Sequence, residues 1–215
     1  MGLKKEDAHV RRGFRSILSN PFIFDKFQKL LGLSRCKARY VSIMNPRSGM
    51  RILDIGCGTA DILEHLPEGI DYHGYDLQPE YIDYASKKFR GRGQFYCQDA
   101  ASLKVKGGSA FDIVMINDIV HHLNNDDAKR VFKIAFACLK DDGYLSTIDI
   151  IKIENQSWLA RYIMSKDRGQ NVRTKSEYEG LVGRDYSITE EYVLNNMYYV
   201  PYTCLVIKAG KKRVE

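Results

Sequence analysis

Three aspartates and one glycine turn have the spacing of a ligand site. Asp54 stands just before the turn Gly56-Cys57-Gly58, and Asp76 and Asp99 close two later apolar segments. Carboxylates accept hydrogen bonds from hydroxyls and amines. Asp76 lies about 20 residues past the glycines, where a carboxylate commonly reaches a ribose diol. Asp99 can accept from an exocyclic amine such as that of adenine, so the spacing predicts a nucleoside-containing ligand.

The glycine turn allows close approach of a ligand to the backbone. Gly56 and Gly58 have no side chain, so the chain can turn sharply there. The apolar run Arg51–Ile55 before it and the pattern Ile62–Leu66 after it predict strand, turn and helix, with the helix N-terminus aimed at the ligand.

A dinucleotide fingerprint would need a third glycine, and that position is Asp61. The charge of Asp54 would also repel a pyrophosphate, whereas it could orient an ammonium group. These two acids disfavour a nicotinamide or flavin dinucleotide.

A pair of histidines follows a fourth apolar run, Phe111–Ile116. Asn117-Asp118 closes this run, and His121-His122 comes shortly after. Four strand ends with polar residues predict one crevice at the carboxyl edge of a parallel sheet. One imidazole could serve as a general base, or His122 could turn inward and anchor the loop. Adjacent residues rarely share a face, so we expect at most one catalytic histidine. We also expect no metal site.

With these motifs the chain resembles a class I S-adenosylmethionine-dependent methyltransferase of the small-molecule type. The resemblance rests on Leu53–Asp61, Gly74–Pro79, Tyr96–Ala100 and Phe111–Leu123, and spans roughly residues 40–150. It implies an α/β fold with a Rossmann-like, seven-stranded, mostly parallel sheet, helices on both faces and an antiparallel last strand. It also implies S-adenosyl-L-methionine as cofactor, S-adenosyl-L-homocysteine as product and no metal.

The resemblance assigns roles to individual residues. Gly56 and Gly58 would hold the methionine part, Asp76 the ribose and Asp99 the adenine, while Asn117 would lie near the sulfonium. His122 resembles the histidine before leucine in related sugar-amine methyltransferases and is the favoured base, with His121 as the other candidate. The cofactor-binding set expected is Asp54, Gly56, Gly58, Asp76, Leu77, Asp99, Ala100 and Asn117.

The periodicity of apolar residues predicts the elements that position this site. We expect a helical cap at 1–47, with helices at 7–20 and 22–44, and a Rossmann-like domain at 48–215 with a substrate-side excursion at 152–185. Within this domain we expect helices over Pro79–Arg90, from Asn125 or Asp126 to Lys140, and over Ser157–Ser165 and Ser176–Val182. Further strands are expected over Tyr144–Ile150, around Ile188–Leu194 and over Tyr198–Ile207, the last inserted between the fifth and sixth.

Substrate contacts are expected from the excursion. Arg168 and Arg173 lie five residues apart around a glycine and could clamp a carboxylate or phosphate. Alternatively, they pair with the nearby acids Glu177, Glu179 or Asp185 in an ordinary loop. Tyr202 could line the acceptor pocket.

The charge distribution leaves the class of acceptor open. The net charge is +6, and residues 1–47 alone carry +8. This basic segment could be a solvated surface, or could attract an anionic acceptor, a membrane surface or nucleic acid. We favour a small polar metabolite or natural-product intermediate, which could be anionic or sugar-containing. A tRNA or nucleic-acid methyltransferase and a non-catalytic scaffold that retains the cofactor site are the alternatives.

Cysteine usage and hydropathy suggest the cellular setting. The five cysteines are odd in number and lack C-x-x-C spacing, which favours reduced thiols. No apolar run approaches the ~20 residues of a membrane-spanning helix. The N-terminal residues lack the apolar segment of a secretory signal. We therefore expect a cytoplasmic protein.

Overall fold

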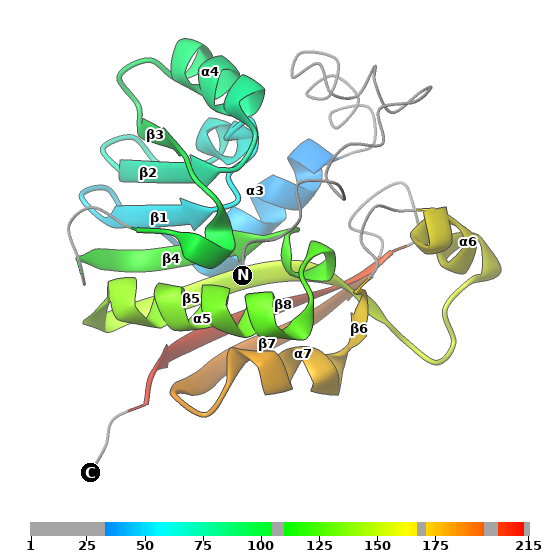
Figure 1. Ribbon diagram of the computed structural model, residues 1–215. Coiled ribbons are helices and arrows are strands. Elements are labelled where there is room, and N and C mark those ends of the chain that lie inside the picture. The colour runs from blue at the N-terminus through cyan, green and yellow to red at the C-terminus, as the bar shows by residue number, and fades with distance from the viewer. Residues whose placement is uncertain (1–32, 105–109, 167–170, 196–201, 213–215) are drawn as a thin grey trace.

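A single mixed sheet organises the protein. The computed structural model describes residues 33–104, 110–166, 171–195 and 202–212. The strands run in the order β3-β2-β1-β4-β5-β8-β7, and the short β6 pairs with β5 outside this path (Figure 1). All neighbours from β3 to β5 are parallel, whereas β8 is antiparallel to both β5 and β7. The predicted Rossmann-like fold with an antiparallel last strand is confirmed.

Strands and helices alternate through most of the described chain. The strands are β1 (Arg51–Ile55), β2 (Asp71–Asp76), β3 (Gln94–Cys97), β4 (Phe111–Asn117), β5 (Leu139–Lys152), β6 (Arg173–Thr174), β7 (Tyr186–Asn195) and β8 (Thr203–Lys211). The α-helices are α3 (Leu33–Met44), α4 (Pro79–Lys88), α5 (Asn125–Cys138), α6 (Trp158–Lys166) and α7 (Lys175–Val182). The 3-10 turns are η1 (Asp61–Glu64), η2 (Ala100–Ser102) and η3 (Val120–His122). Within the described ranges no helix is both long and apolar enough to span a membrane.

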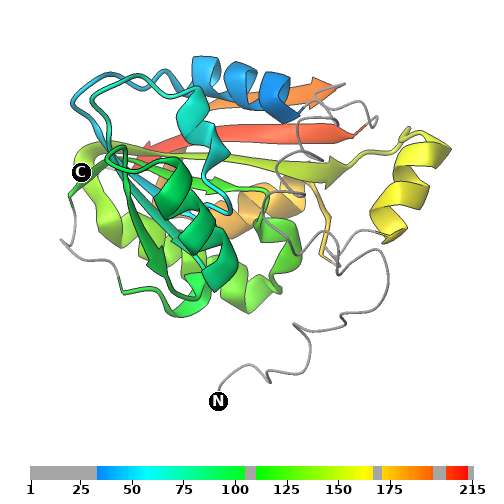
Figure 2. The same ribbon diagram turned by 90° about the horizontal axis from the view of Figure 1, so that it is seen from above.

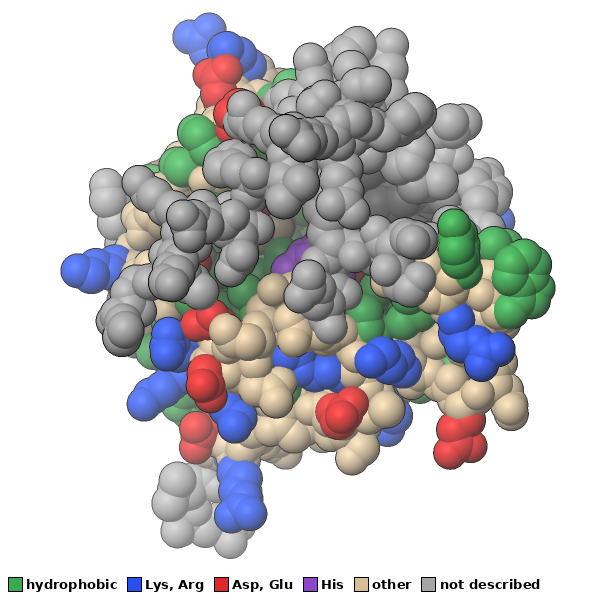
Figure 3. Space-filling view, turned by 45° about the vertical axis from the view of Figure 1, so that its right-hand side comes forward, with side chains coloured by type: hydrophobic (Ala, Val, Ile, Leu, Met, Phe, Trp, Pro, Cys, Tyr) green, Lys and Arg blue, Asp and Glu red, His purple; other side chains and the backbone are tan. Residues whose placement is uncertain are grey.

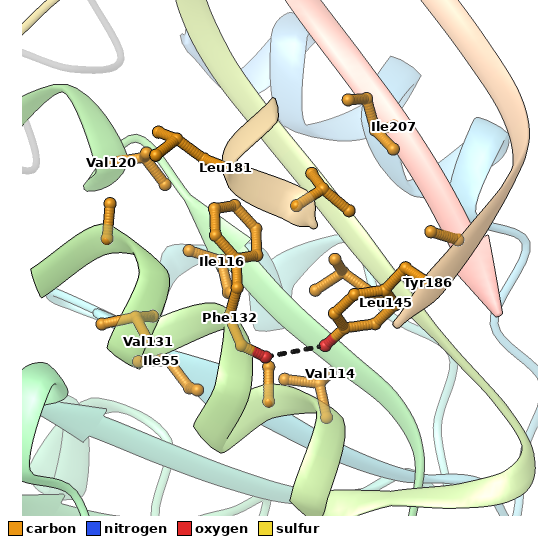
Figure 4. Packing of buried hydrophobic residues seen from close by; sticks show 14 of the residues in the cluster. Ile55, Val114, Ile116, Val120, Val131, Phe132, Leu145, Leu181, Tyr186 and Ile207 are labelled. Atoms are coloured by element: carbon orange, nitrogen blue, oxygen red, sulfur yellow. Dashed lines mark hydrogen bonds between the residues drawn. The ribbon is translucent and has the colours of Figure 1, made fainter. Parts of the chain in front are cut away.

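The two faces of the sheet are covered by different helices. Residues of α5 and α7 pack on one face, and residues of α3, η1 and α4 pack on the other. Figure 2 shows α3 on the opposite side of the sheet from α5 and α7. In the first cluster the Tyr186 hydroxyl reaches through the apolar packing and donates to the carbonyl of Phe132 at 2.9 Å (Figure 4). This packing buries β1 and β4 on both faces, so their carboxyl ends are held rigidly.

The segment after the glycine turn differs from the prediction. Instead of an α-helix over Ile62–Leu66, the chain forms only the 3-10 turn η1, which ends at Glu64. Ala60, just before this turn, lies in the left-handed region with φ 56°. Pro67 follows three residues after the turn, and a proline disfavours helical geometry in the residue before it. The glycine turn is therefore followed by a single 3-10 turn and not by an α-helix N-terminus.

The ends of α5 also differ from the prediction. Its N-cap is Asn124, whose side chain accepts from the backbone N–H of Asp127 at 2.9 Å, not Asn125 or Asp126. The helix ends at Cys138, and β5 begins at the next residue, well before Tyr144. Gly143 lies beside an irregularity in the pairing of β4 with β5, where a Cβ atom would lie 2.8 Å from the Phe111 carbonyl oxygen.

The C-terminal half follows the prediction more closely. The expected helix over Ser176–Val182 is α7, and Thr174 and Glu177 form a capping box at its start. β7 and β8 form the expected antiparallel pair, and β8 lies between β5 and β7. Residues 196–201, where the last strand was expected to begin, lie outside the described residues. So do the predicted helix at 7–20 and the first part of the one at 22–44, of which α3 is the described remainder.

Candidate active site

The strand register brings the predicted ligand residues to one edge of the sheet. Ile55 of β1 pairs with Tyr75 of β2 and with Ile116 of β4. Asp76 pairs with Cys97 of β3, two residues before Asp99. The glycine turn and the polar residues that end β2, β3 and β4 therefore all lie at the carboxyl ends of adjacent strands, which is where open α/β sheets bind ligands.

The two glycines of the turn have different surroundings. Gly56 has φ 84°, and a Cβ atom there would lie 2.4 Å from Cγ2 of Ile119. Gly58 has φ 55°, and a Cβ atom there would meet no atom of the described residues within 4 Å. Gly56 is thus needed for packing against the loop after β4, whereas the described residues leave space beside Gly58 that a ligand can fill.

Asp76 holds the turn in place. Its Oδ2 accepts from the backbone N–H of Gly58 and its Oδ1 from that of Gln78, both at 2.9 Å. A carboxylate offers about four acceptor sites, so both oxygens keep capacity for a ligand diol. Burial raises the pKa of Asp76, opposed by these backbone hydrogen bonds. Leu77 follows with its side chain exposed, beside the same edge.

Two buried oxygens near the turn fit a polar ligand. Asp54 Oδ1 and Asn117 Oδ1 are buried without a hydrogen-bond partner in the described structure. Asp54 Oδ2 accepts from the hydroxyl of Tyr72 at 2.7 Å. Burial raises the pKa of Asp54 to about 7. A cationic group would compensate this carboxylate, so the site fits the ammonium of a bound S-adenosylmethionine.

Asp61 occupies the position of the missing third glycine and has a structural role. Its carboxylate is buried and accepts from the hydroxyl of Thr59 at 2.6 Å and from Nζ of Lys88 at 2.7 Å. Nζ of Lys37 lies 3.7 Å away. This cluster of charges ties α3 and α4 to the turn.

Asp99 and Ala100 begin the turn η2. Asp99 Oδ1 accepts from the backbone N–H of Ala101 at 3.0 Å, so one oxygen caps the turn. Both residues are half-buried at the end of β3. Their place at the sheet edge agrees with the predicted contact to an adenine, which stays a prediction.

The two histidines face different surroundings. His121 is buried, and its Nδ1 lies 2.5 Å from Oδ1 of Asp149, while its backbone N–H donates to Oδ2 of Asp149 at 3.1 Å. His122 is exposed, and the centroids of the two rings are 4.0 Å apart. The inward-facing histidine is therefore His121, not His122 as the anchoring alternative proposed. Figure 3 shows histidine surface near the centre of the face that it draws.

The guanidinium of Arg173 forms its hydrogen bonds within the protein. Its guanidinium donates to Oδ1 of Asn125 and to the carbonyl oxygens of Val120, Leu123 and Asn171, at 2.7–3.0 Å. These five hydrogen bonds use all five donors of an arginine. The prediction that Arg173 clamps an anionic acceptor is therefore wrong. The alternative, in which Arg173 pairs with nearby acids, is also wrong, because its partners are carbonyl oxygens.

The remaining substrate residues are placed only in part. Arg168 lies outside the described residues. Tyr202 is half-buried just before β8 and packs against the cluster that contains α3. Among the described residues, no group of three or more potential metal ligands is found.

Asp149 is a residue of this site that the sequence pattern did not reveal. It lies in the run Ile148-Asp149-Ile150, which predicts only a buried strand. A carboxylate in such a run must be paired, because an isolated buried charge is very costly. The sequence could thus have indicated that Asp149 has a buried partner, but not that this partner is His121.

Comparisons with known proteins agree with this geometry. A family model described as a methyltransferase domain matches residues 52–143. The phosphoethanolamine N-methyltransferase of Plasmodium falciparum is 23% identical over 75% of this chain and 62% of its own length. Phosphoethanolamine N-methyltransferase 1 of Arabidopsis thaliana is 26% identical over 74% of this chain and 32% of its own length. The chain thus spans less than two thirds of these relatives.

Solved structures share the fold at low sequence identity. The [4+2]-cyclase SpnF aligns with a TM-score of 0.69 and 16% identity, covering 84% of this chain and 81% of its own. Geranyl diphosphate C-methyltransferase from Streptomyces coelicolor A3(2), in complex with S-adenosyl-L-homocysteine, has a TM-score of 0.65 and 13% identity, covering 81% and 75%. Since a fold hosts many reactions, these likenesses speak for the architecture alone.

Proposed function

Because the chain belongs to the class I S-adenosylmethionine-dependent methyltransferases, we propose that it methylates a nitrogen or oxygen atom of a small polar acceptor. The observation that carries this proposal is the buried Oδ1 of Asp54, which has no hydrogen-bond partner among the described residues. It lies two residues before a glycine turn that no described side chain fills at Gly58. This arrangement suits a ligand with a cationic amino-acid end.

The residues of the crevice have distinct tasks in this proposal. Gly56 and Gly58 bind the methionine part, with Asp54 oriented toward its ammonium, and Asp76 binds the ribose. Leu77, Asp99 and Ala100 border the adenine. Asn117 lies near the sulfonium end. When bound, the cofactor supplies a methyl group that its positively charged sulfur already activates.

The protein then has to position the acceptor and remove its proton. Exposed His122, on the loop after β4, accepts the proton of an ammonium or hydroxyl nucleophile. General-base catalysis of this kind contributes roughly 10²–10⁴-fold. His122→Ala should therefore lower turnover by about that factor while the affinity for the cofactor stays nearly unchanged.

The relatives suggest which acceptors to try. Their names specify phosphoethanolamine as the methylated compound, so amines of this type are our leading acceptor class. An anionic group on the acceptor would have to be held without Arg173. Arg168 keeps its proposed role in that contact.

Incubation with isotopically labelled methyl donor tests the proposal. Phosphoethanolamine, ethanolamine and a small-molecule cell extract are offered in parallel, and mass spectrometry detects label in the acceptor. We expect transfer by the wild type and by Asp71→Ala, which alters the opposite end of β2, and loss of transfer with Asp76→Ala. Cofactor binding without transfer to any acceptor would favour the scaffold alternative, and transfer to RNA alone would favour the nucleic-acid alternative.

A further inference from the structure

Two buried polar side chains anchor the loop between β4 and α5. Asp149 of β5 is fully buried, and Arg173 of β6 is buried to a similar degree. Both bind the loop that carries His121 and His122. Neither belongs to the set of residues expected to hold the cofactor.

Asp149 fixes both the backbone and the ring of His121. Its Oδ2 accepts from the backbone N–H and its Oδ1 lies 2.5 Å from ring Nδ1. A hydrogen bond between a carboxylate and an imidazole requires a proton on that nitrogen, so Asp149 selects the form of His121 with Nδ1 protonated. The ring is thereby held in one orientation.

Arg173 fixes the backbone on both sides of the histidines. Its donors reach the carbonyl oxygens of Val120, just before them, and of Leu123, just after them. The backbone N–H of Asn171 donates to the carbonyl oxygen of His121 at 3.0 Å. The carbonyl groups of the short loop are therefore tied to the end of the excursion that begins after β5.

We propose that His121 is a positioning residue and not the base. Asp149 acts through His121, and Arg173 acts through the carbonyl groups of Val120 and Leu123, to aim His122 into the crevice. The backbone from Val120 to Leu123 is held at three carbonyl groups and one N–H, so the direction in which the His122 side chain leaves the chain is set. The centroid of the His121 ring lies 4.0 Å from that of His122. This inference rests on the proposed function, in which His122 accepts the proton.

Substitutions at His121 separate positioning from proton transfer. Asparagine places an N–H donor near the position of Nδ1 but cannot act as a base, whereas leucine offers no donor. We expect His121→Asn to keep most of the turnover and His121→Leu to lose on the order of 10²-fold in kcat, the scale of a misplaced catalytic group. Cofactor affinity and acceptor KM should change little in either variant. Equal loss of kcat in His121→Asn and His121→Leu, with both folded, would overturn the proposal.

A spectroscopic measurement tests the same inference without turnover. The chain has five histidines, so their imidazole nitrogen resonances can be assigned with His121→Asn and His122→Ala. In wild type we expect His121 to carry its proton on Nδ1, and we expect Asp149→Asn to shift the resonances of both His121 and His122. Unchanged His122 resonances in a folded Asp149→Asn protein would contradict the proposal. If these shifts occur but no acceptor is methylated, the proposed function fails and the positioning contact stands.

Discussion

Alanine at Gly56 and at Gly58 should have different consequences, because the two glycines share a left-handed backbone but not their surroundings. Both substitutions place a Cβ in that region, which costs roughly 1–2 kcal/mol. At Gly56 the new Cβ also lies 2.4 Å from Cγ2 and 3.0 Å from Cδ1 of Ile119. Overpacking of this kind costs roughly 1–3 kcal/mol more. We therefore expect Gly56→Ala to lose about 2–5 kcal/mol of stability and Gly58→Ala about 1–2 kcal/mol.

Urea denaturation of the cofactor-free proteins measures these differences. Combining Gly56→Ala with Ile119→Ala removes the two overlapping atoms, so the pair should show a favourable coupling of about 1–3 kcal/mol. Gly58→Ala should show no such coupling with Ile119→Ala, and should instead weaken cofactor binding because its Cβ enters the open space. Equal stability of the two glycine variants, or a coupling near zero at Gly56, would refute this account of the turn.

Three other predictions concern single residues. Burial raises the pKa of Asp54 to about 7, so the unfolded chain loses this proton at lower pH than the folded protein does. The free energy of unfolding should therefore fall as pH rises from about 4 to 7. Asp54→Asn should flatten that dependence in denaturation curves. Arg173→Lys has too few donors for the loop carbonyls and should lower the free energy of unfolding by about 1–3 kcal/mol, measured in urea; an unchanged midpoint would contradict this. Thr174→Ala breaks the capping box of α7 and should cost about 0.5–2 kcal/mol, with no effect on cofactor binding by calorimetry.

The cofactor edge could be predicted from the sequence because its features are local. A glycine turn directly after a strand, and acids at the ends of the next strands, occupy adjacent places once the sheet is parallel. Asp76 illustrates this: its distance along the chain from Gly58 sufficed to place it beside the turn, and the structure adds the hydrogen bond between them.

The acceptor side could not be predicted in the same way, because its contacts join distant segments. Arg173 binds carbonyl oxygens about 50 residues earlier in the chain, and no local pattern distinguishes such an arginine from one that faces a ligand. The same holds for Asp149 and His121, which are 28 residues apart. The short η1 was predictable in principle, since Pro67 limits any helix begun at Asp61.

Calorimetric titration with S-adenosyl-L-homocysteine tests whether the crevice at the carboxyl edge of the sheet holds this cofactor through Asp76. We expect micromolar binding by the wild type and by Asp71→Ala, and no binding of NAD. Asp76→Ala should weaken binding by roughly 1–3 kcal/mol, the scale for losing a charged hydrogen-bond partner. Tight binding of NAD with none of S-adenosyl-L-homocysteine would show that the crevice serves another cofactor, and an affinity unchanged in folded Asp76→Ala would remove Asp76 from the site.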